Sequence, residues 1–270
     1  MLLFLIISII ILLYLISEEY VKNQFSHITN GMIAYVYKIL GKNKCEQTNV
    51  ENIIKCKVDE NILFCNKNDI VISDNIRAGI HWESFMHQYF KKFSDKNKIA
   101  LDIGANIGCH TIHLSKYFKE VHSFEPQRKI FNLLKSNVEI NNCNNVKLYN
   151  IGLGITSENV KMQEFDDNSS VNQGGIGIDL NQNGKGEEID IKVLDELNLN
   201  EISFIKLDVE GYEYFVLKGA EKTISISRPV IILEINYKSD KNRTEIFKFF
   251  EKHNYNVKRI SGDDYLAMPN

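Results

Sequence analysis

The sequence predicts an α/β domain whose mostly parallel sheet is covered by helices on both faces. From residue 99 onward, short apolar runs with the character of buried strands alternate with stretches of helical length. A glycine-containing turn directly follows the first of these strands and leads into a helix. With 44% hydrophobic residues, 15 Gly and 3 Pro, the composition is that of an ordinary folded chain and argues against long disorder.

The first element is an uncharged apolar run, Met1–Ser17, which ends at Glu18 and Glu19. As a helix it would span about 25 Å, close to the thinner bilayer cores. Because no Lys or Arg precedes the run and Leu15 stands where a cleaved signal carries a small residue, an uncleaved single-pass membrane anchor is preferred. A cleaved signal and a buried core helix are the alternatives. With Lys22 as the nearest basic residue, orientation is weakly specified but favours an extracytoplasmic domain.

The next two segments are a stem or linker at 18–44 and a region at 45–97 that is expected to pack on the core. Apolar residues at three-to-four spacing predict an amphipathic helix in the stem. Three apolar runs at 45–75 are expected to form short strands, and residues 80–93 are expected to form one helix. These segments precede the main domain, which we place at 98–270.

Three of the five cysteines, Cys45, Cys56 and Cys65, cluster before the main domain. Their spacing is too irregular for a zinc site and lacks a CxxC pair. A disulfide among them is plausible if the domain is extracytoplasmic. Reduced thiols packed as small hydrophobic groups explain the cluster equally well.

The main domain is predicted from its order of apolar strands and helices. The strands are IALDI, VHSFE, VKLYNIGL, FIKLDV, PVIILEI, YNVKRI and DYLAM, and the helices between them are CHTIHLSKYF, QRKIFNLLKSNVEIN, YEYFVLKGAEKTI and RTEIFKFFEKH. Residues 155–193 interrupt this order with Gly- and Asn-rich loops and two strand-like runs. We interpret them as an insertion on the acceptor side of the site.

In such sheets ligands bind beyond the carboxyl ends of the strands. The first strand ends in Asp102 and continues into a turn with Gly104 and Gly108. These glycines permit a tight turn and close backbone approach, and Asp102 places a carboxylate under it. Because the spacing differs from GxGxxG, a dinucleotide pyrophosphate site is less favoured.

The second strand ends in Glu125, about twenty residues after the turn. An acid at this place can accept both hydroxyls of a ribose. NAD and S-adenosylmethionine both carry a ribose, so Glu125 predicts a nucleoside cofactor without deciding between them.

Two later strands also end in acids. Asp208, Glu210 and Glu213 follow FIKL, and we take Asp208 as the leading catalytic candidate. Glu210 and Glu213 would also suit the N-terminal end of the following helix. Asp208 with Glu234 and Asn236 could hold a divalent ion, but no spacing defines such a site and no metal is predicted.

Other polar residues are weaker candidates. His110 is a possible second base, and His113 lies three residues further along the same helix without a third metal ligand. Trp82 and Glu83 could cap a cofactor, although packing is the simpler role. Acidic doublets at Asp166-Asp167 and Asp263-Asp264 are common in loops.

The motifs ALDIGANIG, HSFEP, NVKLYNIGLG, KLDVEGYEYFVLKGA and RPVIILEI together resemble the FkbM-type S-adenosylmethionine-dependent methyltransferases over about residues 80–260. The resemblance implies the class I methyltransferase fold, Rossmann-like, with a seven-stranded sheet whose last strand is antiparallel. It also implies O-methylation of a hydroxyl, often on a sugar or a secreted metabolite.

The resemblance also implies residue roles. At the methionine end of the cofactor it places Asp102, Gly104, Asn106 and Gly108; at the ribose Glu125; beside the adenine Asn150 and Ile151; and facing the methyl group and the acceptor Asp208 and Glu210. The anchor departs from the usual members and favours an acceptor on a membrane-side glycan or lipid.

Three other functions remain open. A nicotinamide-dependent oxidoreductase would need the absent GxGxxG. A non-enzymatic membrane-tethered module would not need Asp102, Glu125 and Asp208. A glycosyltransferase is supported only by the acidic doublets and the anchor. The net charge of −3 argues against a nucleic-acid partner. The resemblance implies a small-molecule or glycan acceptor.

Overall fold

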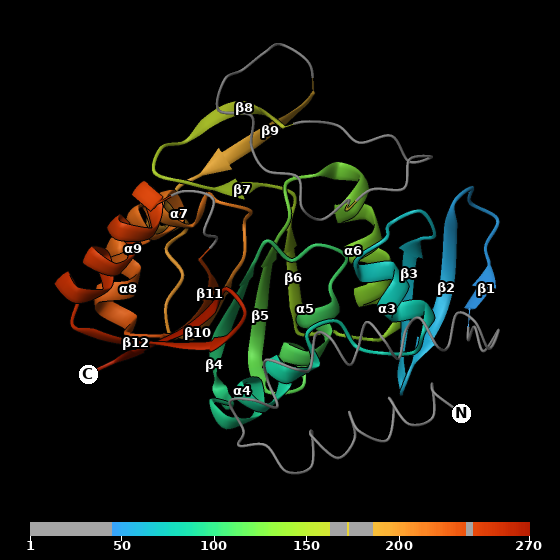
Figure 1. Cartoon of the computed structure of the whole chain (residues 1–270), viewed down its shortest axis with the longest axis horizontal. Helices are drawn as coiled ribbons and strands as arrows, with labels where there is room; N and C mark the ends of the chain where they lie inside the picture. The colour runs from blue at the N-terminus through green and yellow to red at the C-terminus, as the bar shows by residue number, and fades with distance from the viewer. Residues whose placement is uncertain (1–44, 163–171, 173–185, 236–239) are drawn as a thin grey trace, which may run out of the picture.

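The computed structural model describes residues 45–162, 172, 186–235 and 240–270. Its centre is a twisted seven-stranded sheet (Figure 1). In spatial order the strands are β12 (Tyr255–Ser261), β13 (Asp264–Pro269), β11 (Val230–Glu234), β10 (Ile202–Leu207), β4 (Asp95–Ile103), β5 (Phe118–Phe124) and β6 (Val146–Tyr149).

The topology of this sheet is that of the class I methyltransferases. Strands β6, β5, β4, β10 and β11 are parallel to one another, whereas β13 is antiparallel to both β11 and β12. The order reverses beside β4, because the chain fills the sheet on one side of it and then crosses to β10 on the other. The predicted fold class and the antiparallel last strand are therefore confirmed, and the site is expected above the carboxyl ends of β4 and β10.

Helices cover both faces because the central strands are apolar on both sides. On one face Leu101, Ile205 and Leu233 pack against α7 (Glu213–Gly219), α8 (Glu221–Ser227) and α9 (Asp240–Lys252). On the other face Ala100 and Phe204 pack against α4 (His87–Lys92) and α5 (Cys109–Ser115). α6 (Arg128–Ile140) extends this second layer, with Leu134 fully buried against Ala105.

The segment before the core forms an antiparallel sheet of β1 (Cys45–Gln47), β2 (Ile53–Val58) and β3 (Asn61–Asn66). Two asparagines of α6 hold it in place. The side chain of Asn137 bonds both the backbone N–H and the carbonyl of Phe64, and Asn141 bonds those of Ile62. Each amide thus pairs with β3 as a neighbouring strand would.

Two local predictions in this segment were wrong. The run at 70–72, expected to be a strand, leads into helix α3 (Ile72–Arg77), because an apolar run this short does not separate helix from strand. The helix expected at 80–93 is broken at Glu83, whose φ is +44°, and continues as a 3₁₀ turn, η1 (Ser84–Met86), before α4.

The insertion at 155–193 is described only in part. Its two strand-like runs form β8 (Glu158–Met162) and β9 (Glu187–Lys192), which join β7 (Gly152–Leu153) in a small separate sheet above the carboxyl ends of the main strands (Figure 1). A second 3₁₀ turn, η2 (Leu194–Leu197), leads back to β10. Asp166-Asp167 and Asn236 lie outside the described residues.

The anchor expected at 1–17 and the stem at 18–44 also lie outside the residues that the structure describes. Within the described residues, no helix has the length and apolar character needed to cross a bilayer.

Candidate active site

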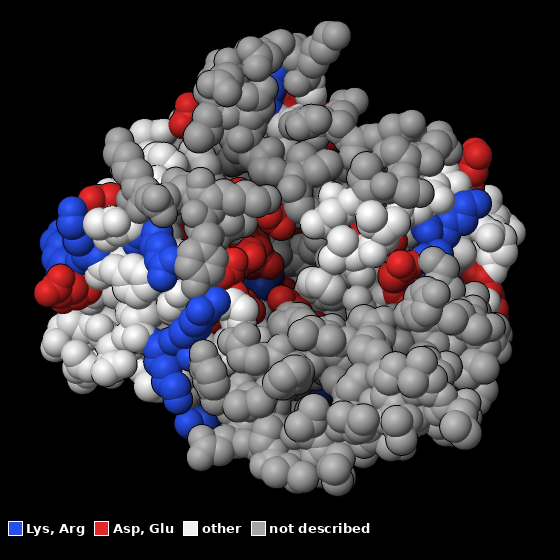
Figure 2. Space-filling view, in the orientation of Figure 1, with Lys and Arg blue, Asp and Glu red and all other residues white. Residues whose placement is uncertain are grey.

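A cavity opens above the carboxyl ends of β4, β5 and β10. In the space-filling view acidic side chains gather in a hollow near the centre of the face shown (Figure 2). The described residues that line the cavity include Trp82, Gly104, Ala105, Asn106, His110, Phe124, Glu125, Gln127, Ile151, Met162, Asn172, Lys206, Asp208, Glu210 and Tyr212. The cavity therefore lies where the strand order predicted a ligand site.

The turn after β4 is shaped by a close approach of two backbones. A Cβ on Gly104 would lie 1.7 Å from the carbonyl oxygen of Asp208, so only glycine fits, and its φ of +77° also favours glycine. The N–H groups of Gly104 and Ala105 both donate to the carbonyl of Phe124, at 3.0 and 2.9 Å. This fixes the turn against the neighbouring strand ends.

Glu125 is held by backbone donors at the end of β5. The N–H of Asn106 donates to Oε2 at 3.0 Å and that of Gln127 to Oε1 at 2.9 Å. Burial raises the pKa of Glu125 to about 7, although both of these bonds act in the opposite direction. A carboxylate oxygen has more than one lone pair, so both oxygens can still accept hydrogen bonds from hydroxyl groups of a ligand.

Lys206 is the buried cation of the site. Its ammonium donates to the carbonyl of Gly104 at 3.0 Å and to Oδ2 of Asp208 at 3.2 Å, and it lies 3.8 Å from Oδ1 of Asp102. Asp102 is fully buried, and its Oδ2 accepts from the hydroxyl of Thr111 at 2.5 Å. Lys206 therefore joins the carboxylates at the ends of β4 and β10.

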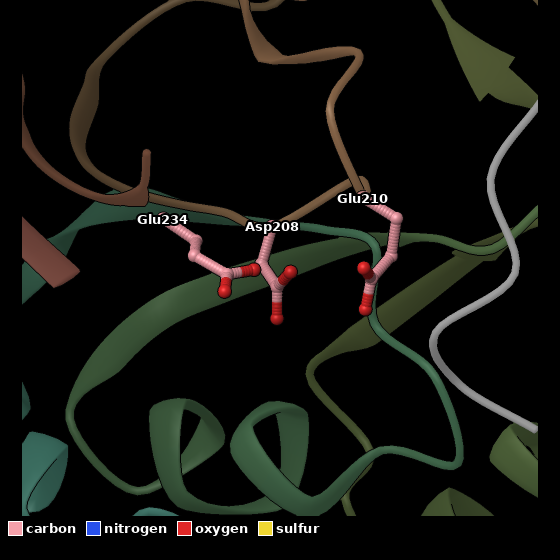
Figure 3. Close-up of side chains that lie close together, drawn as sticks. All are labelled: Asp208, Glu210 and Glu234. Carbon is pink, nitrogen blue, oxygen red and sulfur yellow. The ribbon is translucent and has the colours of Figure 1, made fainter. Parts of the chain in front are cut away.

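Asp208, Glu210 and Glu234 form the acidic wall. One carboxylate oxygen from each lies within 4.8 Å of the others. The carboxyl groups of Glu234 and Asp208 meet, and that of Glu210 lies on the other side of Asp208 (Figure 3). Oxygen ligands suit Mg²⁺ or Ca²⁺, so the three residues could hold a divalent ion, although the ammonium of Lys206 already neutralises part of their charge.

The pKa values of Glu234 and Asp208 within this wall are shifted in opposite directions. Burial and the charges of Asp208 and Glu210 raise the pKa of Glu234. Burial would also raise the pKa of Asp208, but the Lys206 ammonium and a hydrogen bond from Glu234 outweigh it and lower that pKa. Glu234 thus carries the proton, and Asp208 is the charged member of the pair.

Glu83 and Asp264 add two carboxyl groups beside the acidic wall. Burial and the charges of Glu83, Asp208 and Glu234 raise the pKa of Asp264, which is 7% exposed. Because the acids outnumber the ammonium of Lys206 among the described residues on the β10 side of the cavity, this side disfavours an anionic ligand.

The residues predicted for the site are arranged around the cavity in two ways. Gly104, Asn106, Glu125, Ile151, Asp208 and Glu210 line it. Asp102, Gly108 and Asn150 lie behind the lining: Asp102 is buried beside Lys206, a Cβ on Gly108 would meet the side chain of Leu134, and the Asn150 amide donates to the carbonyls of Glu125 and Pro126. These last three shape the walls.

Sequence reasoning assigned no role to Lys206. The sequence signal for such a role is a lysine inside the apolar strand FIKL, since a buried ammonium needs anionic partners.

Glu213, left open between a functional acid and a helix-terminal charge, accepts hydrogen bonds from the N–H groups of Val209 and Gly211 at 3.1 and 3.0 Å. Its contacts are thus those of a turn-stabilising residue.

The hydrogen-bond acceptors that line the cavity suit the nucleoside cofactor that Glu125 predicts. Glu125 lines the cavity, and its carboxylate has acceptor capacity beyond the two backbone N–H groups that it already binds. Gly104 brings no side chain into the cavity beside it. A ligand with ribose hydroxyls therefore fits the acceptor oxygens of Glu125.

Comparison with known families gives a match that covers more than half of the chain. The methyltransferase FkbM domain model matches residues 102–257. A curated relative, Methyltransferase 1 of Beauveria bassiana (strain ARSEF 2860), is 27% identical over 166 residues, which are 53% of this chain and 66% of that protein. The chain thus matches just under two thirds of the length of this relative.

Among solved structures, methyltransferase FkbM from Methylobacillus flagellatus KT has 18% identity and a TM-score of 0.48, covering 69% of this chain and 51% of that one. A putative methyltransferase from Streptococcus mutans in complex with SAH has 17% identity and a TM-score of 0.43, covering 68% of this chain and 94% of that one.

Proposed function

Because the chain belongs to the FkbM methyltransferase family, whose methyl donor is S-adenosylmethionine, we propose that it methylates a hydroxyl oxygen of a neutral sugar or glycan. The observation that carries this proposal is the division of one cavity into two halves. Glu125 stands on the side of β5, and Asp208 with Glu210 stands on the side of β10. The acid proposed to bind the ribose and the acids proposed to bind the acceptor are thus held on the two strands that flank β4.

The cofactor half of the cavity is the side of Glu125 and of the turn at Gly104, where the backbone closely approaches that of Asp208. We propose the following placements: Asp102, Gly104, Asn106 and Gly108 around the methionine end, Glu125 at the ribose, and Asn150 and Ile151 beside the adenine. The bound sulfonium would supply an electrophilic methyl group. The protein's part is to hold the donor and the acceptor in line and to remove the hydroxyl proton.

The acceptor half favours a neutral polyol. Carboxylates such as Asp208 and Glu210 accept hydrogen bonds from sugar hydroxyls in pairs. Lys206 is bonded to Asp208 and Gly104, so it is not available to neutralise an anionic acceptor. From the acceptor-side insertion, Met162 and Asn172 line the cavity, and we propose that this segment selects the acceptor.

We also propose that the protein is a single-pass membrane protein with its catalytic domain outside the cytoplasm. The uncharged run Met1–Ser17 supports the anchor. A disulfide between Cys45 and Cys56 supports an oxidising compartment, since such bonds are rare in the cytosol. Resistance of the full-length protein to carbonate extraction, with protease protection in sealed vesicles, would test both points.

Calorimetric titration of the full-length protein tests the cofactor first. Micromolar binding of S-adenosylmethionine without binding of NAD is expected, whereas preference for NAD would support the oxidoreductase. Tritium transfer from labelled S-adenosylmethionine is then measured with methyl glycosides of neutral hexoses and with the matching uronic acids. Transfer to the neutral glycosides is expected, and preference for the uronic acids would contradict the acceptor class.

The Asp208→Asn variant separates the two halves. It should bind S-adenosylmethionine nearly as well as the wild type and lose turnover, because its carboxylate is placed on the acceptor side. Equal loss of cofactor binding in Asp208→Asn and Glu125→Ala would refute this division of roles.

A further inference from the structure

A histidine and a glutamate outside the acidic wall form a buried pair. Nε2 of His110 lies 3.0 Å from Oε2 of Glu83, and the two side chains are 6% and 13% exposed. A carboxylate accepts hydrogen bonds and does not donate them, so this contact favours the proton on Nε2. The other ring nitrogen, Nδ1, then keeps its lone pair.

This second nitrogen has no use within the described structure. Nδ1 of His110 is buried and has no hydrogen-bond partner among the described residues. Buried polar atoms are normally paired, so an unpaired one at a cavity indicates a group that arrives with a ligand. His110 lines the same cavity as Asp208 and Glu210.

Asp208 and Glu234 are poorly suited to accept a proton from a hydroxyl. Asp208 is paired with Lys206 and bonded by Glu234, and a carboxylate held in this way is a weak base. Burial raises the pKa of Glu234, so this carboxyl already carries a proton. These two residues can orient the acceptor, but neither is suited to act as the base.

We propose that His110 is the general base of the methyl transfer and that Glu83 is the residue that positions it. This inference rests on the proposed function. As the acceptor oxygen forms its bond to the methyl carbon, the bond from that carbon to sulfur breaks and its electron pair stays on sulfur. The hydroxyl proton moves to Nδ1 of His110, and Glu83 stabilises the resulting imidazolium through Nε2.

The pair joins two parts of the chain. His110 stands in the first turn of α5, directly after the turn that ends β4. Glu83 precedes the residues matched by the family model. Its φ is +44°, and its carbonyl accepts a hydrogen bond from the N–H of Met86, which closes the turn that follows Glu83. The segment before the family domain therefore supplies half of the proposed base.

The tautomer of His110 tests the proposal without an acceptor. Full-length protein labelled with ¹⁵N-histidine contains seven histidines, and the His110 signals are those missing from His110→Gln. At pH 8 we expect a neutral ring with its proton on Nε2 and a bare Nδ1. Glu83→Leu should shift the ring toward a mixture of tautomers, whereas Glu83→Gln, whose amide oxygen still accepts, should largely retain the wild-type form. A proton on Nδ1 in the wild type would overturn the proposal.

Turnover gives the second readout, on the methyl glycoside that reacts fastest with the wild type. His110→Gln should lower kcat by about 10²–10⁴-fold and leave the KM for S-adenosylmethionine nearly unchanged. The matched control is His113→Gln, one turn further along α5, because His113 contacts His81 and not Glu83. Turnover of His110→Gln within about threefold of the wild type would also overturn the proposal.

Calorimetric binding of S-adenosylmethionine distinguishes the two failures. If wild type and His110→Gln bind it equally and only the base test fails, the proposed function stands without this pair. If the wild type itself does not bind, the proposed function fails first.

Discussion

The ammonium of Lys206 lies 3.2 Å from the carboxylate of Asp208, and Lys206 is 3% exposed. The same ammonium is 3.8 Å from Oδ1 of Asp102. One cation thus connects the ends of the two central strands, and the cavity lies directly beside this connection. Stability and site geometry therefore depend on the same ion pair.

Replacing Lys206 by Met should destabilise the protein by about 3–5 kcal/mol, because it leaves Asp102 and Asp208 charged without their partner. Urea unfolding measures the change. Lys192→Met is the matched control, since its pair with Asp190 is 2.9 Å long but about 40% exposed on both sides. That control should change stability by less than about 1 kcal/mol. Equal effects of both substitutions would contradict a buried, structural ion pair.

Gly104→Ala should abolish or strongly weaken binding of S-adenosylmethionine. The new Cβ would stand 1.7 Å from the carbonyl oxygen of Asp208, so the turn must move away from β10. Gly262→Ala is the control, because its φ is also positive, at +45°, but a Cβ there meets nothing within 4 Å. Calorimetric titration should show tight binding by Gly262→Ala, and normal binding by Gly104→Ala would show that the close approach is unimportant.

The sheet could be predicted because its strands are apolar on both faces and their helices have ordinary lengths. The strand-end acids followed from the same pattern, since carboxyl ends of parallel strands meet at one edge. Asp102, Glu125 and Asp208 are therefore recognisable from the sequence as strand-end acids, whereas their partners are not.

The partners are tertiary and leave little trace in the sequence. Lys206 appears in the sequence as one lysine in an apolar strand, and its three oxygen contacts come from two strand ends, residues 102–104 after β4 and Asp208 after β10. The break in the helix at Glu83 cannot be predicted from the sequence, because a left-handed backbone is uncommon for a glutamate and is usually indicated by glycine or asparagine. Residues 80–93 were consequently expected to form one helix, and the contact with His110 could not be inferred.

Binding of S-adenosylmethionine should weaken below about pH 7. Burial raises the pKa of Glu125 to about 7, and a protonated carboxyl loses acceptor capacity for the ribose hydroxyls. Calorimetric titrations at pH 6 and pH 8 test this dependence. Glu125→Gln should bind with similar affinity at both values, and Glu125→Ala should lose about 1–3 kcal/mol at pH 8. A wild-type affinity that does not change with pH would argue against the proposed ribose contact.

Acid should destabilise the histidine cluster between the N-terminal segment and α5. The rings of His87 and His113 stack 3.6 Å apart, and burial lowers their pKa values from 6.5 to about 3 and about 2. Between pH 6.5 and about 3 the unfolded chain binds more protons at these sites, so their contribution falls as the pH falls. Each of the two histidines should lower the free energy of unfolding by about 1–2 kcal/mol between pH 6.5 and pH 5.

Raised pKa values act in the opposite direction. Glu125, Glu234 and Asp264 bind protons more readily in the folded state, so they favour folding as the pH falls. The histidine term is therefore measured as a difference between the wild type and the His87→Gln, His113→Gln double variant. Urea unfolding at both pH values should show a smaller acid loss in the double variant. Parallel pH profiles would contradict the assigned cause.

Reduction should destabilise the edge of the N-terminal sheet. Cys45 and Cys56 are a directly opposed pair on β1 and β2, and their disulfide closes a loop with a sequence separation of 11. Loop-closure entropy at this length corresponds to about 2–3 kcal/mol, which dithiothreitol should remove in urea unfolding. Cys45→Ser should be insensitive to the reductant, whereas Cys143→Ser, which removes a free thiol, should keep the wild-type response.

Alkylation of the unfolded, unreduced protein followed by mass spectrometry should modify Cys65, Cys109 and Cys143 alone. Modification of all five cysteines would show that the bond does not form, and it would remove one of the two supports for an extracytoplasmic domain.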